Sequence, residues 1–464
     1  MPFAFAARFP DAAAAGGFDM VVGNPPWVRL HHLPVVDRER WRREYRVFRD
    51  AAWASGARLA RAGAGFGSQV DAASLFIERG LELLRPGGVM SYLVPSKLWR
   101  SLAGGGVRRL LSERTQLLAL EDWSDAPAQF DAATYPSLLA VRSGPSGAAS
   151  TRADGSCRLA IHRGRLQVVW RGSRGTVPLD DSPGAPWLTL PPEARSAFDR
   201  LGRAGVVLAE AGIGTVTLGV KTGCNEAFLV RVTGGRGTRA EVTDGARRGE
   251  VEASHLRPVL RGEAVRSWCA ERGDERIIFL HGPDARPVSP LPEGARTWLR
   301  PWRARLEARS DARQARAWWS LFRLEGASPR TPRVVWADIG RSLQAMVLPA
   351  GDRSVPLNTC YVLPTRDLVD AHTLAALFNS ALVDAWLSVL CEPARGGYRR
   401  HLAWCMARVP LPDDWVRARE ALAPLGERGM AGDAPGRAEL LAAVLDSYRL
   451  RHASVAGLLA WMNH

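Results

Sequence analysis

The sequence is poor in lysine, in closely spaced cysteines and in long apolar runs. Only two of its 62 lysine and arginine residues are lysines, Lys97 and Lys221, so arginine carries almost all of the positive charge behind a net charge of +15. The six cysteines include no Cys-x-x-Cys pair, which gives no indication of a zinc knuckle or of a disulfide framework. We therefore expect a reduced, metal-free, cytoplasmic protein.

No stretch reaches about 18 uninterrupted apolar residues, so no transmembrane helix and no membrane partner are expected. The first residues lack a charged start followed by an apolar block, so we expect no signal peptide. The chain has 464 residues, of which 46% are hydrophobic, enough for two or three globular domains. The arginine excess has two explanations: a GC-rich coding sequence, or a polyanionic partner whose phosphates and guanine edges suit guanidinium groups.

Apolar runs and helical patterns alternate over residues 1–145. The run "DMVVG", residues 19–23, predicts a short, fully buried strand, and "VMSYLVP", residues 89–95, predicts a second. Between them, residues 71–85 place apolar side chains at helical spacing before Pro-Gly-Gly ends the helix. Two further strands follow before residue 145. This alternation predicts a parallel α/β sheet, whose ligands lie at the carboxyl ends of its strands.

The first predicted strand ends in Asn-Pro-Pro-Trp, residues 24–27. The two prolines lack a backbone N–H and make the corner rigid. Asn24 offers a side-chain carbonyl and Pro25 a backbone carbonyl, and two converging acceptors are what an exocyclic NH₂ group requires. Accepting both hydrogens of adenine N6 draws the nitrogen toward tetrahedral geometry and exposes its lone pair. Because a duplex hides N6, the base must be turned out, and Trp27 offers a flat face on which it can stack.

Asn24–Trp27 resembles the catalytic motif of the N6-adenine DNA methyltransferases, where the aromatic residue is usually Tyr or Phe. Residues 74–101, "SLFIERGLELLRPGGVMSYLVPSKLWRS", are similar to the segment that follows this motif in TaqI-like and type IIG restriction–modification enzymes. Residues 117–141 are similar to the last strands of that domain. In the family, a Phe of the helix packs on the flipped adenine from the other side, and Phe76 matches its position. The alternative is that Phe76 is a core residue.

The resemblance implies a Rossmann-like fold that binds S-adenosylmethionine through a glycine-rich loop and an acidic residue, both ahead of the catalytic motif. Only 23 residues precede Asn24. We interpret "AGAGFG", residues 62–67, as a loop and "AGGGV", residues 103–107, as the start of a helix, so no cofactor-binding residue is assigned. We expect the N-terminal half of the domain on a separate chain, upstream of a misassigned start, or lost.

Residues 205–412 resemble the target-recognition domain of type IIG-like enzymes. The similarity rests on "AGIGTVTLGVKTGCNEAFLV", residues 211–230, on "HLRPVLRGEAVRSW", residues 255–268, and on three later segments in the same order. The resemblance implies double-stranded DNA as partner, and basic side chains are the candidates for phosphate or guanine contacts, although each could equally be a solvated charge. "RGGYRR" is the best group, because its glycines let a phosphate approach the backbone. The candidates are Lys221, Arg257, Arg261, Arg395, Arg399 and Arg400.

The expected fold class is α/β, with four regions along the chain. Residues 1–145 form the C-terminal part of a Rossmann-like methyltransferase sheet with the catalytic motif, and residues 146–204 connect it to the next region. Residues 205–412 form a mixed α/β target-recognition domain, and residues 413–464 a helical C-terminal segment. We expect Asn24, Pro25, Pro26 and Trp27 to be catalytic, with Trp27 and Phe76 stacking on the target base.

Three functions fit the sequence. The first is a site-specific adenine-N6 DNA methyltransferase of a restriction–modification or phage-defence system, split or truncated, with S-adenosylmethionine as methyl donor. The second is a non-catalytic DNA-recognition module left by loss of the cofactor-binding half. The third is a protein-glutamine methyltransferase, whose family also uses an Asn-Pro-Pro-Tyr motif but has no target-recognition domain. Restriction activity is not expected, because no P-D…(D/E)-x-K pattern is present.

Overall fold

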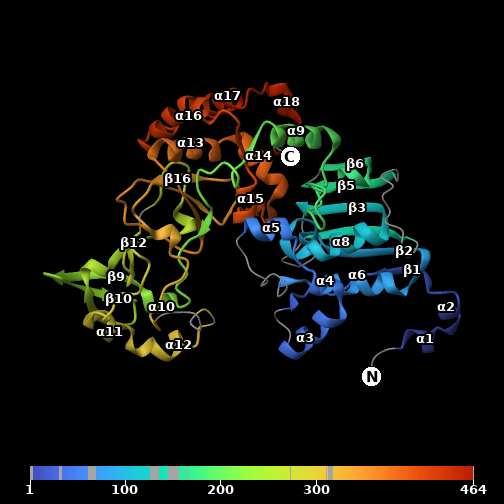
Figure 1. The fold of residues 1–464 in the computed structure, drawn as a ribbon, viewed down its shortest axis with the longest axis horizontal. Coiled ribbons are helices and arrows are strands. Elements are labelled where there is room, and N and C mark those ends of the chain that lie inside the picture. Colours follow the sequence, from blue (N-terminus) through green and yellow to red (C-terminus); the bar gives the residue numbers. More distant parts are fainter. Residues whose placement is uncertain are drawn as a thin grey trace. The chain divides into compact units, whose positions relative to one another are not determined.

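The computed structural model describes residues 4–30, 34–60, 69–125, 135–144, 156–164, 166–271, 273–309, 311, 317–394 and 396–462. The chain divides into two compact units (Figure 1). Unit 1 contains Met1–Arg200, Ala385–Arg400 and Ala453–His464, and unit 2 contains Leu201–Asp384 and His401–His452. Arg395 and the "AGAGFG" segment lie outside the described residues.

Unit 1 is built on a six-stranded sheet in the order β1-β2-β4-β3-β5-β6. Two neighbouring pairs, β1 with β2 and β3 with β5, are parallel, and the other three are antiparallel. The expectation of a parallel sheet is therefore wrong. Only ten residues separate β3 from β4 in the sequence, whereas a connection between parallel neighbours takes a dozen or more. The strands are β1 Phe18–Gly23, β2 Leu84–Pro95, β3 Thr115–Asp125, β4 Pro136–Ser143, β5 Ser156–Arg163 and β6 Leu166–Ser173.

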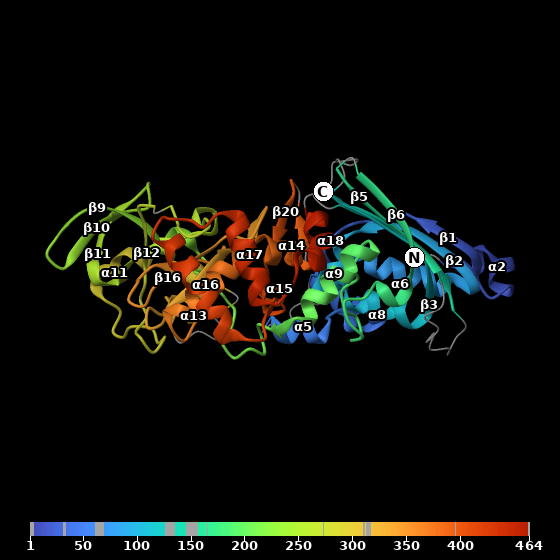
Figure 2. The same ribbon diagram turned by 90° about the horizontal axis from the view of Figure 1, so that it is seen from above.

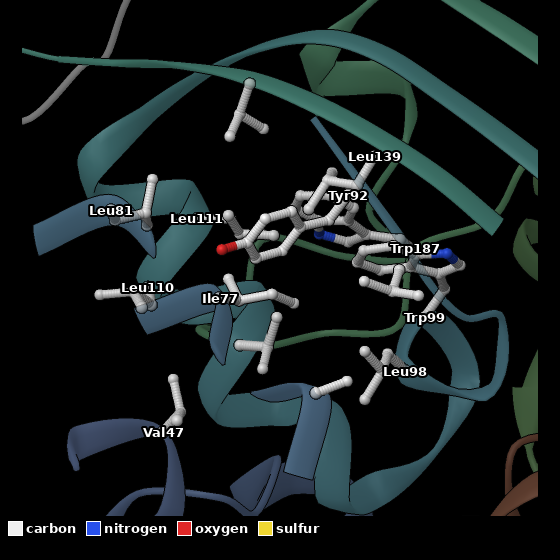
Figure 3. Close-up of a cluster of buried hydrophobic side chains, with 14 of the residues drawn as sticks. Val47, Ile77, Leu81, Tyr92, Leu98, Trp99, Leu110, Leu111, Leu139 and Trp187 are labelled. Carbon is white, nitrogen blue, oxygen red and sulfur yellow. The ribbon is translucent and has the colours of Figure 1, made fainter. Parts of the chain in front are cut away.

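One face of this sheet is covered by α6, Ala72–Leu83, and α8, Gly105–Arg114. Asp71 caps α6 by accepting a hydrogen bond from Ala73 N at 3.1 Å, and Ile77 and Leu81, one turn apart, enter the core beside Tyr92 (Figure 3). Gly80 lets α6 approach β2 closely, because a Cβ there would lie 2.6 Å from the Tyr92 hydroxyl. The predicted helix is confirmed, but Pro86–Gly88 do not end it, because the helix ends at Leu83 and these residues lie in β2, which begins at Leu84.

The prediction that β1 is fully buried is wrong. Met20 is 62% exposed and Val22 is 70% exposed, whereas Val21 packs against the core on the α6 side. The physical reason is position: β1 is the end strand of the sheet, and its pairing partner among the described strands is β2 alone.

The buried side chain of Arg108 connects two loops of unit 1 through hydrogen bonds. Arg108 is 0% exposed and donates hydrogen bonds to the carbonyls of Gly184 at 3.0 Å, Ala185 at 2.8 Å and Ser101 at 2.9 Å. These loops follow α7, Lys97–Arg100, and precede α9, Pro192–Arg203. A guanidinium that satisfies several carbonyls can be buried where an unpaired charge could not.

Unit 2 contains two main sheets, ordered β11-β10-β9-β13-β12-β17 and β16-β14-β18-β8. The strand expected around residues 216–220 is present but shorter: β8 contains only Thr217–Leu218. The helices include α11 Glu293–Leu299, α13 Leu368–Phe378, α16 Trp415–Met430 and α17 Arg437–Ser447. The strands are β8, β9 Leu229–Arg236, β10 Arg239–Thr243, β11 Arg248–Glu252, β12 Leu256–Leu260, β13 Glu275–Ile278, β14 Arg333–Ala337, β16 Ala345–Leu348, β17 Val355–Pro356 and β18 Cys360–Pro364.

The C-terminal residues are helical, ending with α18, His452–Met462. Within the part of the chain that the structure describes, no single helix is long and apolar enough to cross a membrane. The one bent pair that reaches such a length, α13 with α14, Ala381–Leu390, consists mostly of buried residues.

Candidate active site

The Asn-Pro-Pro-Trp corner lies at the carboxyl end of β1, beside the end of the parallel strand β2. Asn24 and Pro26 are exposed, whereas Pro25 is buried and Trp27 is half-buried against the core of unit 1. The corner thus has a fixed backbone and an accessible amide. This is the geometry that a hydrogen-bonding site for an incoming group requires.

Two backbone hydrogen bonds hold residues 28–30, the arm that follows the corner. Ala72 N donates to the Val28 carbonyl at 2.8 Å, and Leu30 N donates to the Val70 carbonyl at 2.9 Å. The chain after the corner is therefore paired with the residues that lead into α6. The corner and the N-terminus of α6 form one local structure.

Trp27 has an unused donor. Its Nε1 is buried and has no hydrogen-bond partner among the described residues. Buried indole N–H groups usually find an acceptor, so the position is open to an acceptor from a ligand or from another polypeptide segment.

Phe76 lies on the exposed side of α6, with its side chain 46% exposed. Arg79, one turn later, forms an ion pair with Glu82 at 2.9 Å, so these three residues form a solvent-facing stripe. A core role for Phe76 does not fit this exposure. Phe76 therefore exposes its ring to solvent. It does so on α6, the helix whose first residues pair with the chain that follows the corner.

A buried ion pair next to the corner was not expected from the sequence. The Lys97 ammonium lies 2.8 Å from the Asp71 carboxylate, whose side chain is 1% exposed. Asp71 also forms an antiparallel β-bridge with Arg29. The available signal was the position of Lys97 just after β2, because the ends of neighbouring parallel strands meet at one edge of a sheet.

The glycine-rich hairpin of β19, Glu392–Ala394, and β20, Tyr398–Arg400, belongs to unit 1. It packs against α7 and β3, and Gly396 and Gly397 adopt φ values of 83° and 76° at its turn. These values favour glycine.

The hairpin shares an electrostatic environment with the corner. Burial raises the pKa of the Glu392 carboxyl group, and the positive charges of Arg400, Arg29 and Lys97 oppose that shift. Arg399 and Arg400 were predicted to contact DNA as part of the target-recognition domain, residues 205–412. In the structure they lie in unit 1, the same compact unit as Asn24.

Three of the predicted DNA contacts, Lys221, Arg257 and Arg261, lie in unit 2 and already have protein partners. Arg257 is 7% exposed, stacks 4.2 Å from the centroid of Phe279 and donates to two backbone carbonyls, which leaves little of it for DNA. Burial lowers the pKa of Arg257 to about 10. Arg261 forms a two-point ion pair with Glu275 at 2.7 and 3.0 Å. Lys221 lies 2.5 Å from the Asp311 carboxylate, and both side chains are partly exposed.

No group of three or more metal-ligating side chains occurs among the residues that the structure describes. The "AGGGV" segment forms a 3-10 turn, Leu102–Gly104, and the first turn of α8, as interpreted from the sequence.

The chain is similar to known restriction–modification proteins. Residues 2–128 match the family model "Eco57I restriction-modification methylase". The chain is 28% identical over 431 residues to the type II methyltransferase M.PaeR7I of Pseudomonas aeruginosa, covering 89% of this chain and 67% of that protein. It is 25% identical over 434 residues to M.XhoI of Xanthomonas vasicola, covering 90% of this chain and 72% of that protein.

Among solved structures, the chain is similar to the type IIL restriction–modification enzyme MmeI in complex with DNA. The TM-score is 0.58 at 10% identity, and the match covers 98% of this chain but 58% of the MmeI chain. This likeness concerns the fold. Residues 2–128 are thus similar in sequence to the Eco57I restriction–modification methylases, and most of the chain is similar to type II methyltransferases.

Proposed function

We propose that the protein is the modification component of a restriction–modification or phage-defence system, a DNA methyltransferase that acts on adenine N6. The observation that carries this proposal is the corner at the end of β1, where Pro25 is buried and the Asn24 amide is exposed. Similarity to the type II methyltransferases supports DNA as the substrate. Residues 205–412 would then supply much of the recognition of the target sequence.

The residues of the corner have separate roles in this reaction. The Asn24 side-chain oxygen and the Pro25 carbonyl accept the two hydrogens of N6, which localises the nitrogen lone pair away from the ring. Trp27 stacks on the extruded base, and Phe76 covers its other face. S-adenosylmethionine, when bound, supplies an electrophilic methyl group. Once methylated, N6 would release one of its two hydrogens as a proton to solvent and keep the other, which stays hydrogen-bonded to one acceptor of the corner.

The corner fits the reactive end of this cofactor, since its two carbonyl oxygens raise the nucleophilicity of an amine and place no positive charge beside a sulfonium. The adenosine and ribose need further residues, and we assign them to a segment outside residues 1–464, either on a separate chain or on a longer form of this one. The alternative is a DNA-recognition module without activity. A protein-glutamine methyltransferase is disfavoured by the similarity to type II methyltransferases across unit 2.

Expression of the native locus, including the segment outside residues 1–464, in a host that lacks DNA methylation tests the function, with single-molecule sequencing as the readout. N6-methyladenine at one short sequence motif is the expected result, absent from the Asn24→Ala strain. N4-methylcytosine would keep the transfer but overturn adenine as the base, because cytosine N4 also carries two hydrogens. An unmodified genome, together with sequence-specific DNA binding by the protein isolated from its own host, would support the inactive module.

A further inference from the structure

The hairpin of β9 and β10 extends past the sheet to which it belongs in unit 2. Among the described strands, β13 pairs with Leu229–Arg231 of β9 and no further, whereas β10 follows β9 as far as the turn. All nine residues 231–239 are exposed. Strand β9 extends out of the body of unit 2 in Figure 1, and Figure 2 shows the same hairpin from above. We call residues 231–241 the β9–β10 ribbon.

The glycines of the ribbon have different explanations. Gly237 begins the two-residue turn with a φ of 61°, as a type II′ hairpin requires. Gly235 has a φ of 153°, and a Cβ there would lie 2.6 Å from the Arg239 carbonyl oxygen. Gly234 has no such backbone reason, because the nearest atoms to a Cβ there belong to the Glu241 carboxylate, the closest at 3.0 Å. A glycine within a strand lowers stability and often marks a close approach of a ligand.

One face of the ribbon is open to solvent. The register places Arg236 opposite Arg239 and Gly234 opposite Glu241, and cross-strand partners lie on the same face. These four residues are exposed. The other face of β10 packs in the core of unit 2 through Ala240 and Val242, as the alternation of side chains along a strand requires. The open face therefore consists of two arginines, a glycine and a carboxylate.

The charges on this face are of both signs. Arg236 forms no ion pair with the residues that the structure describes, whereas Arg239 lies 3.7 Å from Glu250 and 3.8 Å from Glu293. Glu241 lies opposite Glu250 of β11. Carboxylates repel phosphates, so the face is poorly suited to the DNA backbone. Base edges in the major groove offer both kinds of partner, since guanine O6 and N7 accept from arginine and cytosine N4 donates to a carboxylate.

The two arginines also lack an acceptor between them. Like charges directly opposite each other in an antiparallel pair destabilise it. Arg239 is partly neutralised by its two glutamates, which leaves Arg236 as the guanidinium available to a ligand. A planar guanidinium binds two acceptors of one guanine at once.

The dimensions of the ribbon fit the groove. The major groove admits a two-stranded ribbon and is about 12 Å wide and about 8.5 Å deep. From Val232 to Arg236 the strand advances by four residues, about 14 Å at ~3.4 Å each. The tip can therefore reach the base edges while the rest of unit 2 remains outside the groove.

We propose that the β9–β10 ribbon enters the major groove of duplex DNA and that Arg236 binds O6 and N7 of a guanine in the recognition sequence. Gly234, which has no side chain, keeps the face beside Arg236 low enough for the base pair to approach. This inference rests on the proposed function, with DNA as the substrate. It makes Arg236 a specificity-determining residue, in contrast to Arg257 and Arg261, whose guanidiniums are bound within the protein.

The test uses the protein expressed from its native locus and a library of duplexes with a randomised central segment. Sequencing the bound duplexes gives the preferred sequence without any methyl transfer. Arg236→Ala removes the guanidinium, and Arg236→Lys keeps the charge but loses the two-point contact. Arg437→Ala is the matched control, because Arg437 is also exposed, on α17 of the same unit. Circular dichroism should be the same for all four proteins.

The wild type and Arg437→Ala should select one sequence that contains guanine. Both Arg236 variants should select the same sequence with one G·C position open to other base pairs, and their affinity for the wild-type sequence should fall at least about fivefold. Affinity of Arg236→Lys for unrelated duplexes should stay within about twofold, because its charge is retained.

An unchanged preferred sequence in Arg236→Ala would overturn the proposal. An equal loss of affinity for all duplexes would do so as well, since it indicates a phosphate contact, and so would a wild type that selects no sequence. The methyltransferase function is tested separately, with labelled S-adenosylmethionine on the selected duplexes. If none is methylated while the Arg236 variants still relax one position, the ribbon reads DNA and the proposed methyltransferase function is wrong.

Discussion

Lys97 and Asp71 form a buried ion pair, 2.8 Å between Nζ and Oδ2, that joins the end of β2 to the start of α6. Asp71 caps α6 with its other carboxylate oxygen and is bridged through its backbone to Arg29, three residues beyond Pro26. Asp71 thus connects the end of β2 and the helix that carries Phe76 through its carboxylate, and the residues that follow the corner through its backbone. The pair fixes the relative positions of the groups on which the proposed reaction depends.

Replacing Lys97 by Met should lower the free energy of unfolding by about 3 kcal/mol, because the Asp71 carboxylate would remain buried without its cation. The matched control is the other lysine of the chain. Lys221→Met breaks an exposed pair with Asp311 and should cost about 1 kcal/mol or less. Urea denaturation of both variants provides the comparison. Equal decreases in the free energy of unfolding would show that the Lys97–Asp71 pair stabilises the fold no more than the exposed Lys221–Asp311 pair.

Asn24→Ala should reduce methyl transfer at least ~10²-fold, by analogy with loss of one hydrogen-bonding group from an oxyanion hole. Stability should not change, because the Asn24 side chain is exposed. Labelled S-adenosylmethionine and the complete enzyme provide the rate. Full activity of the Asn24→Ala enzyme would show that the corner does not bind adenine N6.

Trp27 should tolerate Phe but not Ala. Stacking of a base on an aromatic ring is worth about 1–3 kcal/mol, and Phe retains that face. With 2-aminopurine at the target position, Trp27→Ala and Phe76→Ala should each reduce the fluorescence change on binding. Unchanged fluorescence in both variants would place the extruded base elsewhere. Since Phe76 is 46% exposed, its loss should leave the unfolding midpoint nearly unaffected.

Local patterns predicted local structure well. The helix at Ala72–Leu83 follows from its apolar spacing, and the strand before it follows from an apolar run that ends in glycine and proline, whereas Pro86–Gly88 lie inside β2 and do not end the helix. The exposure of Met20 and Val22 could not be predicted in this way. Their pattern is that of a buried strand, and exposure depends on which other segment lies beside them.

Long-range partners explain the remaining differences. Arg257 has the appearance of a basic surface residue in the sequence, but its acceptors are the carbonyls of Ala327 and Arg353, far along the chain. The β19–β20 hairpin lies in unit 1 although more than 360 residues separate it from the corner in sequence. The spacing of apolar residues along the sequence carries no information about such contacts between distant segments.

Arg399 and Arg400 should contribute to DNA affinity through phosphate contacts. Each neutralised phosphate adds ~0.9 to the slope of log K against log salt, so replacing both by Ala should lower that slope by about one to two. The charge-matched control is Arg417→Ala with Arg428→Ala, whose guanidiniums are paired with acidic side chains on the C-terminal helices. Fluorescence anisotropy of a labelled duplex at several salt concentrations gives the slopes. If affinity holds while the preferred sequence changes, these arginines read bases.

His281 should make stability depend on pH below neutrality. Its side chain is buried beside Phe279, and burial lowers the pKa of His281 from its usual 6.5 to about 4. Because the folded pKa is the lower one, the unfolded chain binds more protons between these values, so this contribution to stability is complete above pH 6.5 and is lost as pH falls toward 4. The loss should approach about 3 kcal/mol, at ~1.4 kcal/mol per pKa unit. Urea midpoints between pH 7.5 and 4 should fall more steeply for the wild type than for His281→Gln, which cannot titrate there. Parallel curves for the two proteins would show that His281 keeps an ordinary pKa in the fold.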